Sequence, residues 1–451
     1  MWSLDGGADP NESQKPQKIN FRNRVVTNIF PESEFSGYIS SPRSARLSTK
    51  METSLITLVV KPGEADRLIA GHPWVYSSSI QRSSEPPTDG DLVQLKDHRH
   101  RFLGVGFYNS RSKIKVRMLS TERVEVNCEF FVERIRAALA VRKRHMPDAT
   151  SFRVVSAEAD QLSGLIIDKY GDVVVLQISS LGMEKHKADI VKAIQKVLQP
   201  RSVYERNEIA SRQFEGLPPL AGLLAGEPVE TVEVTINGLK FTVDLRAGHK
   251  TGMYLDQQVN QARVGAIAKD AVVLDCFTFL GGFALHCARG GARQVIALDQ
   301  SEDAVQAARI NAERNRFSGN TQFEVCNVFD WLKAKTATGP NERLVPMFDL
   351  IILDPPSFTR NRASVPDALR GYKEIHVRAL KLLKPGGTLA TFCCSHHVDG
   401  RLFEDVALSA AYDQRKLLRR VATYSQAPDH PILPSIPETE YLKGAAYELV
   451  R

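Results

Sequence analysis

One stretch of the chain decides the fold class, residues 271–288, which read AVVLDCFTFLGGFALHCA. Its first residues form the apolar run of a buried strand, and Asp275 ends that run. Gly281 and Gly282 then let the backbone approach a ligand closely at the start of a predicted helix. The G-x-G-x-x-G spacing of a pyrophosphate loop is absent from this turn, which counts against a dehydrogenase and favours a cofactor without a diphosphate.

Four further strand-like runs follow, at 295–298, 323–326, 350–353 and 388–392. Their alternation with helical patterns indicates a parallel sheet covered on both faces, an α/β fold. Ligands of such a sheet bind beyond the carboxyl ends of the strands, where the strand order reverses. The sequence therefore predicts that one crevice is lined by Asp275 and by the residues at the other four strand ends: Asp299, Asn327, Asp354 and one of the pair Cys393 and Cys394.

Each of these residues also has an ordinary structural explanation. Asp and Asn after a strand commonly cap helices, and a cysteine in a buried strand is commonly a small hydrophobe. Five such residues at five consecutive strand ends favour a nucleoside cofactor. In that interpretation Asp299 accepts hydrogen bonds from ribose hydroxyls and Asn327 approaches the adenine.

The rest of the chain divides into three segments before this domain. An aperiodic stretch rich in Ser, Asn, Pro and Arg predicts a disordered extension, with Met51 as an alternative start. Short apolar runs separated by turn residues then predict a small β-rich module, in which Trp74 either fills the interior, the favoured interpretation, or stacks on a base. An amphipathic, basic helix is predicted at 130–144, from apolar residues at Phe131, Ile135, Leu139 and Val141, and its charges are interpreted as a solvated face. This helix connects the β-rich module to a central α+β domain. The predicted boundaries are 1–53, 54–125, 126–245 and 246–451.

Composition excludes several classes of protein. With 451 residues, 43% hydrophobic and 25% charged, the chain should fold into two or three domains. The net charge of +7 permits a polyanionic partner without proving one. No apolar run approaches the roughly 18 residues of a membrane span, and no signal peptide is visible, which predicts a cytoplasmic protein. Six cysteines without a C-x-x-C pair argue against disulfides and a metal site.

These motifs resemble the S-adenosylmethionine-dependent methyltransferases of the Rossmann-like class, and more closely the bacterial large-subunit (23S) rRNA cytosine carbon-5 methyltransferases. The resemblance extends from about residue 56 over nearly the whole remaining chain. The loop at residues 248–257 and the sequence around Cys394 are its most specific motifs. Residues 71–76 resemble the family's PUA module, an RNA-binding β-barrel. Residues 248–257, GHKTGMYLDQ, resemble its cofactor-side loop. Two further segments, 371–374 and 441–444, also match the family.

The resemblance implies roles for matching residues. Residues of the first strand and its turn would line the methionine part of the cofactor, with the ribose and adenine at the next two strand ends. The implied cofactor residues are Asp256, Asp275, Phe277, Gly281, Gly282, Asp299, Gln300, Asn327, Val328 and Asp354. The implied substrate residues are Trp74, Lys250, Tyr254, Gln258, Tyr372 and Lys373.

The chain departs from the family pattern at three positions. Leu280 stands where Thr is usual, Gln258 where Arg is usual, and Ser357 where Lys is common. The change at Gln258 alters an arginine interaction expected near the substrate phosphate. None of the three departures removes a catalytic group.

Methylation of cytosine carbon 5 needs a nucleophile, because carbon 5 alone reacts poorly. A thiolate that adds to carbon 6 pushes electron density onto carbon 5, which then attacks the methyl group. Successive strand residues face opposite sides, so Cys393 and Cys394 cannot both reach the base, and the resemblance selects Cys394. Asp354 is suited to hydrogen-bond N3 and the exocyclic amine. The acceptor of the carbon 5 proton stays open among Asp354, Glu374, His376 and His396, although His396 is interpreted first as a solvent-side residue.

Two other functions remain open from the sequence. An amino-group methyltransferase would use the acid and two prolines at 354–356 to hold an exocyclic amine, and it would need no thiol. A non-catalytic RNA-binding or assembly factor would bind RNA without the cofactor. The expected partner is 23S rRNA, naked or partly assembled, with the target base outside its stack. A homodimer is implied by the resemblance alone.

Overall fold

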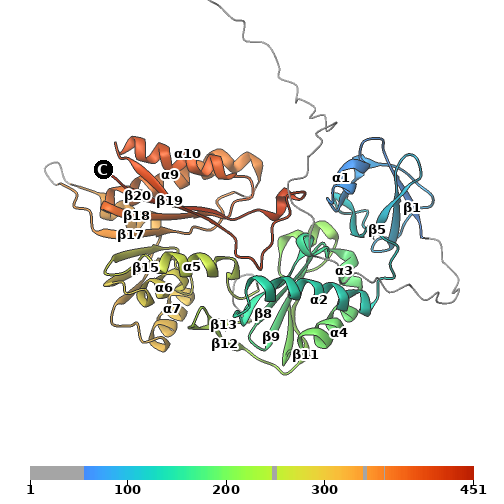
Figure 1. Cartoon of the computed structure of the whole chain (residues 1–451), viewed down its shortest axis with the longest axis horizontal. Coiled ribbons are helices and arrows are strands. Elements are labelled where there is room, and N and C mark those ends of the chain that lie inside the picture. Colours follow the sequence, from blue (N-terminus) through green and yellow to red (C-terminus); the bar gives the residue numbers. More distant parts are fainter. Residues whose placement is uncertain (1–54, 246–250, 339–342, 360) are drawn as a thin grey trace, which may run out of the picture. The chain divides into compact units, whose positions relative to one another are not determined.

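The computed structural model describes residues 55–245, 251–338, 343–359 and 361–451 (Figure 1). The predicted extension, Met51 and Lys250 lie outside the described residues. The described residues form four sheets, of six, five, two and seven strands in chain order. The last of these sheets carries the predicted crevice, and the others are described first.

The six-stranded sheet confirms the predicted β-rich module. Its strands are β1 (Thr57–Val60), β2 (Trp74–Tyr76), β3 (Ile80–Ser83), β4 (Leu92–Lys96), β5 (Phe102–Tyr108) and β6 (Ile114–Ser120), and helix α1 (Ala65–Ile69) precedes β2. They pair in the order β2-β6-β5-β4-β1-β3. Within β2, Val75 points into the core of the module, so its neighbour Trp74 points outward and is half-buried. The favoured interpretation of Trp74 as an interior plug is therefore wrong.

The central domain contains the predicted mixture of helices and strands. Its sheet has the order β11-β10-β9-β8-β7. Helix α2 packs against α4 and buries Phe131 and Ile135, together with the guanidinium of Arg142. The predicted amphipathic character of this helix is confirmed on its apolar face, whereas Arg142 is buried there rather than solvated. The elements are α2 (Cys128–His145), β7 (Ser151–Ser156), β8 (Leu165–Tyr170), β9 (Val173–Ile178), α3 (Leu181–Lys185), α4 (Lys187–Leu198), β10 (Ser202–Arg206) and β11 (Ala221–Gly226).

A two-stranded hairpin, β12 (Thr231–Ile236) and β13 (Leu239–Asp244), connects the central domain to the last one. Alternate residues of both strands are buried in one apolar cluster with α6 and α7 of the last domain. The amide nitrogen of Thr242 donates to Asn311 Oδ1 at 3.0 Å. The hairpin is thus tied to the last domain, although it precedes the boundary predicted at residue 246.

The seven-stranded sheet confirms the predicted Rossmann-like fold. Its strands are β14 (Val272–Cys276), β15 (Gln294–Asp299), β16 (Thr321–Val325), β17 (Phe348–Leu353), β18 (Leu383–Cys393), β19 (Leu418–Ser425) and β20 (Lys443–Leu449). The order is β16-β15-β14-β17-β18-β20-β19; β14 to β18 run parallel, and β20 is antiparallel to both its neighbours. The order reverses between β14 and β17, where a ligand crevice is expected.

Helices cover both faces of this sheet, as the alternation of the sequence predicts. They are α5 (Gln258–Gly265), α6 (Gly282–Arg289), α7 (Glu302–Arg314), α8 (Val328–Thr336), α9 (Val365–Leu382) and α10 (Gly400–Asp413). Figure 1 shows α9 and α10 on one side of the strands and α5, α6 and α7 on the other. Each side has its own apolar cluster, and both clusters fix the carboxyl ends of the strands. Among the described residues, no helix combines the length and apolarity needed to cross a bilayer.

Candidate active site

A cavity of about 1160 Å³ lies where the strand order reverses. It receives one or more residues from the turn after each parallel strand: Phe277, Asp299, Asn327, Asp354 and Cys394. The structure therefore brings together the strand ends that the sequence predicts to share one crevice. The central domain and the loop before α5 contribute further walls, including Arg153, Thr251, Tyr254 and Asp256.

The turn after β14 is held by Asp275, which lies behind the cavity wall. Asp275 is fully buried, and its Oδ2 accepts hydrogen bonds from Thr278 Oγ1 at 2.6 Å and from the Ala284 amide at 3.0 Å. Thr278 lines the cavity, whereas Asp275 does not. Burial raises the pKa of Asp275 to about 7. The expectation that Asp275 lines the cofactor directly is thus corrected: its contacts shape the turn.

The same turn carries backbone strain on the cavity side. Phe277 and Phe279 have φ angles of 68° and 50°, in the left-handed region that non-glycine residues rarely adopt. Gly281, with φ of 83°, caps α6 and lies off the cavity wall, while Gly282 lies on it. Phe279 is fixed by its amide, which donates to Asp299 Oδ2 at 2.9 Å.

Asp299 and Asn327 also support the backbone around them. Asp299 Oδ1 accepts from the Ser301 amide at 3.0 Å. Asn327 Oδ1 caps α8 by accepting from the amides of Phe329 and Asp330 at 2.9 and 3.3 Å. Both side chains line the cavity, with Gln300 and Val328 beside them. These residues therefore support the backbone, as sequence reasoning allowed, and also line the cavity.

Cys393 and Cys394 face opposite sides, as strand alternation predicts. Cys393 is fully buried, and its Sγ donates to the Tyr372 hydroxyl at 3.4 Å. Cys394 is half-buried on the cavity wall, with its Sγ 3.8 Å from the carbonyl oxygen of Pro355. Asp354 lies on the same wall, and its Oδ1 accepts from Gln257 Nε2 at 3.0 Å. A thiol and a carboxylate thus share one wall.

Similar proteins are known for both halves of this architecture. Residues 58–121 match the PUA-like domain model, and residues 216–434 match the model of the S-adenosylmethionine-dependent methyltransferases. The ribosomal RNA large subunit methyltransferase I of Pseudoalteromonas translucida (strain TAC 125) is 39% identical over 390 residues, 85% of this chain and 97% of that protein. The enzyme of the same name from Tolumonas auensis (strain DSM 9187 / NBRC 110442 / TA 4) is 38% identical over 394 residues, 86% and 98% of the two chains.

The chain belongs to the ribosomal RNA large subunit methyltransferase I family. Its cofactor is S-adenosylmethionine. A solved structure from Streptococcus mutans, described as a SAM-dependent methyltransferase, shares the fold with a TM-score of 0.73 and 22% identity, covering 87% of this chain and all of that one. A methyltransferase structure complexed with SAH has a TM-score of 0.75 at 23% identity and the same coverage.

The cavity of this family member fits such a cofactor. Gln261, on the cavity wall, has a buried Oε1 without a hydrogen-bond partner among the described residues. An unpartnered acceptor there suits the ammonium group of a methionine moiety, because buried acceptors gain most from a charged donor. Sequence reasoning missed Gln261. Its spacing of four from Gln257, which also lines the cavity, places both on one helical face and was the available signal.

Three residues that the resemblance assigns to the substrate lie off the cavity. Tyr372 is fully buried, because it shares the inner face of α9 with Ala368 and Ile375. Lys373 forms an ion pair with Asp413 of α10 at 2.8 Å. The geometry therefore corrects the assignment of Tyr372 and Lys373 to the substrate. The third residue, Gln258, is described below. Trp74 and Tyr254 do line the cavity.

Two of the four candidates for the proton acceptor also lie off the cavity. His376 is fully buried between the Tyr372 carbonyl and Thr391 Oγ1, and burial lowers its pKa to about 4. Glu374 is exposed and pairs with Arg378 at 2.9 Å. Asp354 and His396 remain on the wall; His396 is exposed, as sequence reasoning expects for a solvent-side residue.

Tyr254 lies among acidic groups of the cavity. Burial raises the pKa of the Tyr254 hydroxyl, and the nearby Asp354 and Cys394 add to this effect, so the phenol stays protonated. Its neighbour Asp256 accepts a hydrogen bond from the Tyr441 hydroxyl at 2.6 Å. Tyr441 reaches the site from the segment before β20, which sequence reasoning noted only as a family segment.

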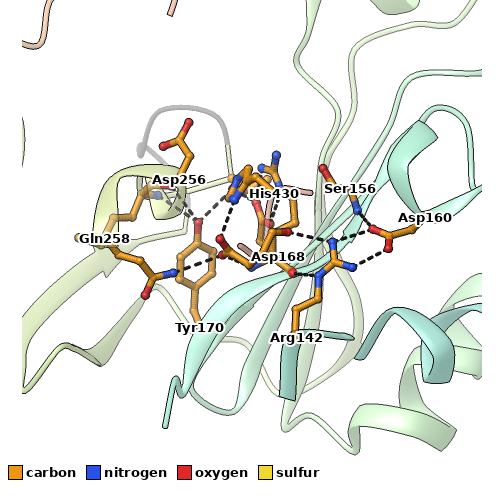
Figure 2. A network of polar contacts seen from close by, with 12 residues as sticks. Arg142, Ser156, Asp160, Asp168, Tyr170, Asp256, Gln258 and His430 are labelled. Carbon is orange, nitrogen blue, oxygen red and sulfur yellow. Dashed lines mark hydrogen bonds and ion pairs between the residues drawn. The ribbon is translucent and has the colours of Figure 1, made fainter. Parts of the chain in front are cut away.

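A buried polar network ties the central domain to the cavity wall (Figure 2). Arg142 donates to both oxygens of Asp160, at 2.5 and 2.7 Å, and to the carbonyl of Asp429 at 2.8 Å. The Asp429 carboxylate accepts from the Arg153 amide at 2.9 Å and from Gln258 Nε2 at 3.3 Å. Gln258 is thus used inside the protein, which corrects its assignment to the substrate.

The same network anchors the loop that precedes Tyr254. Arg153 pairs with both oxygens of Asp168, at 2.7 and 2.9 Å, and Asp168 accepts from Thr251 Oγ1 at 2.6 Å. Burial alone would raise the pKa of Asp168, but the Arg153 guanidinium holds it below its usual value. The Tyr170 hydroxyl accepts from the Met253 amide at 3.1 Å. The central domain therefore fixes one wall of the cavity.

Proposed function

We propose that this protein transfers a methyl group from S-adenosylmethionine to carbon 5 of a cytosine in 23S rRNA, through a covalent adduct of Cys394. Relatives named ribosomal RNA large subunit methyltransferase I support large-subunit rRNA as the substrate. The observation that carries the cytosine chemistry is the position of Cys394. Of the six cysteines, all of which the structure describes, Cys394 alone lines the cavity, and it shares a wall with Asp354.

In the proposed reaction the Cys394 thiolate forms a bond to carbon 6 of the cytosine. The carbon 5–carbon 6 electron pair moves onto carbon 5, which becomes nucleophilic enough to accept a methyl group. Bound S-adenosylmethionine supplies that methyl group. Asp354 hydrogen-bonds the N3 and amine edge of the base, where charge develops. A base then takes the carbon 5 proton, the Sγ–carbon 6 bond breaks, and the ring is restored; Asp354 and His396 are the predicted candidates on the wall.

The remaining cavity residues are assigned by position. For the cofactor we propose Phe277, Gly282, Asp299, Gln300, Asn327, Val328, Asp256 and Gln261, with Asp275 and Gly281 shaping the turn. For the base and its flanking nucleotides we propose Tyr254 and Trp74. A cytoplasmic location and a homodimer stay predictions.

A single experiment tests the chemistry. Unmodified large-subunit rRNA is incubated with labelled S-adenosylmethionine and wild-type protein, Cys394→Ala or Cys326→Ala, and the modified nucleoside is identified by mass spectrometry. Cys326 is the matched control because it follows β16 at the same edge of the sheet but lies off the cavity wall. We expect 5-methylcytidine from the wild type and Cys326→Ala and none from Cys394→Ala.

Other outcomes of this experiment identify the alternatives. A nucleoside methylated on nitrogen that survives Cys394→Ala would identify an amino-group methyltransferase. RNA binding without methylation or cofactor binding would identify an assembly factor.

A further inference from the structure

The residue that follows Cys394 is held by three separate elements. Ser395 is fully buried, and its Oγ lies 3.0 Å from the Tyr372 hydroxyl on α9 and 3.0 Å from Ser357 Oγ in the turn after β17. Its carbonyl oxygen accepts a hydrogen bond from Lys443 Nζ on β20 at 2.9 Å. Ser395 therefore cannot move without breaking contacts to all three.

Tyr372 contacts both neighbours of Cys394 in the sequence. Its hydroxyl oxygen accepts from Cys393 Sγ at 3.4 Å on one side and lies against Ser395 Oγ on the other. Burial raises the pKa of Tyr372, so the phenol keeps its proton. Because the Cys393 thiol donates to the phenol oxygen, the phenol proton is available to Ser395. The two hydrogen bonds flank Cys394 and leave its own side chain facing the cavity.

Ser357 extends these contacts to the turn that carries Asp354. Ser357 lies three residues after Asp354, and its Oγ contacts both Ser395 Oγ and the Thr359 carbonyl, the latter at 3.2 Å. Ser357 is exposed on the cavity side, whereas Ser395 and Tyr372 lie in the interior. A chain of hydroxyl groups thus runs from the core under α9 to the cavity rim and joins the two turns that hold Cys394 and Asp354.

We infer that Tyr372, Ser395 and Ser357 form a hydroxyl clamp that positions Cys394 against Asp354. The inference rests on the proposed function, because it matters only if Cys394 attacks the base. The three are positioning residues, since they act through the backbone of residues 393–395. Ser357, where a lysine is common in the family, supplies the hydroxyl that closes the clamp in this chain. A misplacement of about 1 Å in a reacting group can cost about 100-fold in rate.

The test measures adduct formation directly. RNA containing 5-fluorocytidine carries fluorine where the proton must leave, so the Cys394–carbon 6 bond forms, carbon 5 is methylated, and elimination is blocked. The trapped protein–RNA adduct is quantified on denaturing gels under single-turnover conditions for wild type, Tyr372→Phe, Ser357→Ala and Ser357→Thr. Cofactor affinity is measured by calorimetry, and thermal unfolding is followed for each protein.

Tyr447→Phe is the matched control, because Tyr447 is a buried tyrosine of β20 in the same sheet and lies outside the clamp. We expect Tyr372→Phe and Ser357→Ala to slow adduct formation about 10- to 100-fold, with the cofactor Kd changed less than twofold. Ser357→Thr, which keeps the hydroxyl on an exposed residue, should restore the wild-type rate within about threefold. Tyr447→Phe should match the wild type.

Three results would overturn the inference in different ways. If the wild type forms the adduct and Tyr372→Phe and Ser357→Ala form it equally fast, the clamp does not position Cys394, and the proposed function stands. If the wild type methylates RNA without any adduct, the proposed function is wrong and the positioning role falls with it. A loss of rate accompanied by equal loss of cofactor affinity in Ser357→Ala would assign a structural role to the clamp and also count against positioning.

Discussion

At the scale of single residues, several polar side chains at the strand ends hydrogen-bond to the backbone around the cavity, and their position in the sequence does not reveal this. Asp275 shapes the glycine turn from behind the wall, and Asn327 caps α8 while it faces the cavity. The buried carboxyl of Asp275 lies close to its titration point at neutral pH, since its pKa is raised to about 7. Charge at this residue should therefore affect the stability of the whole domain.

Asp275→Asn should make stability less dependent on pH. A carboxyl whose pKa is about 7 when folded and about 4 when unfolded holds more protons in the folded state, so stability falls as pH rises from about 4 to about 7. The loss in the wild type amounts to at most about 4 kcal/mol. Urea unfolding at pH 4.5 and 7.5 should show a smaller decrease for Asp275→Asn. An equal decrease in both proteins would contradict this prediction.

Gln261→Ala should weaken cofactor binding by about 10- to 100-fold, because a hydrogen bond from a charged group is worth about 1.5–3 kcal/mol. Calorimetric titration with S-adenosylmethionine measures the change. Gln294→Ala, on an exposed residue of β15 off the cavity wall, is the control and should leave the Kd unchanged. Equal affinities for wild type and Gln261→Ala would show that the unpartnered oxygen faces no ligand group.

At the scale of secondary-structure elements, α2 belongs to the site more closely than its sequence indicates. The helix reads as basic and amphipathic, yet Arg142 points inward and reaches Asp160 and the Asp429 carbonyl (Figure 2). Asp429 lies 287 positions away from Arg142 in the chain. A sequence pattern reports periodicity within one helix, and it carries no information about such a distant partner.

Arg142→Met should lower the free energy of unfolding by about 3–5 kcal/mol, because it leaves the buried Asp160 carboxylate unpaired. Arg144→Met, an exposed change on the same helix, should cost no more than about 0.5 kcal/mol. Denaturant titration of both variants gives the comparison. Similar losses for the two variants would mean that the buried Arg142–Asp160 pair does not stabilise the fold.

Local signals predicted the strands and their ends, and the distant contacts lay beyond them. The apolar runs and their polar last residues placed the crevice, because the carboxyl ends of parallel strands share one edge. The resemblance assigns Tyr372 to the substrate, but Tyr372 lies in the core, because its neighbours on α9 decide which face of the helix is buried. The assignment of Gln258 to the substrate is wrong for a similar reason, because its partner, Asp429, is distant in the sequence. The interpretation of Trp74 as an interior plug is wrong because the three-residue strand β2 is too short for its alternation to be read from the sequence.

At the scale of the whole molecule, RNA and the cofactor are expected to bind through different forces. RNA binding to a chain of net charge +7 releases counterions from phosphates, whereas cofactor binding in the cavity depends on a few buried contacts. We expect RNA affinity to fall at least 10-fold between 50 and 200 mM salt while the cofactor Kd changes less than twofold. Filter binding and calorimetry at both salt concentrations measure this. RNA affinity that is insensitive to salt would exclude a phosphate-dominated interface.

The order of the last sheet has a consequence for how the protein is made. β20, residues 443–449, is inserted between β18 and β19, which precede it in the chain. During synthesis, β18 therefore has an unpaired edge until Leu449 has left the ribosomal exit tunnel. Before then, Tyr441 cannot reach the cavity and Lys443 cannot reach the Ser395 carbonyl. The nascent chain thus exposes the unpaired edge of β18 to chaperones until this segment has emerged from the ribosome, and we expect no methylation before then.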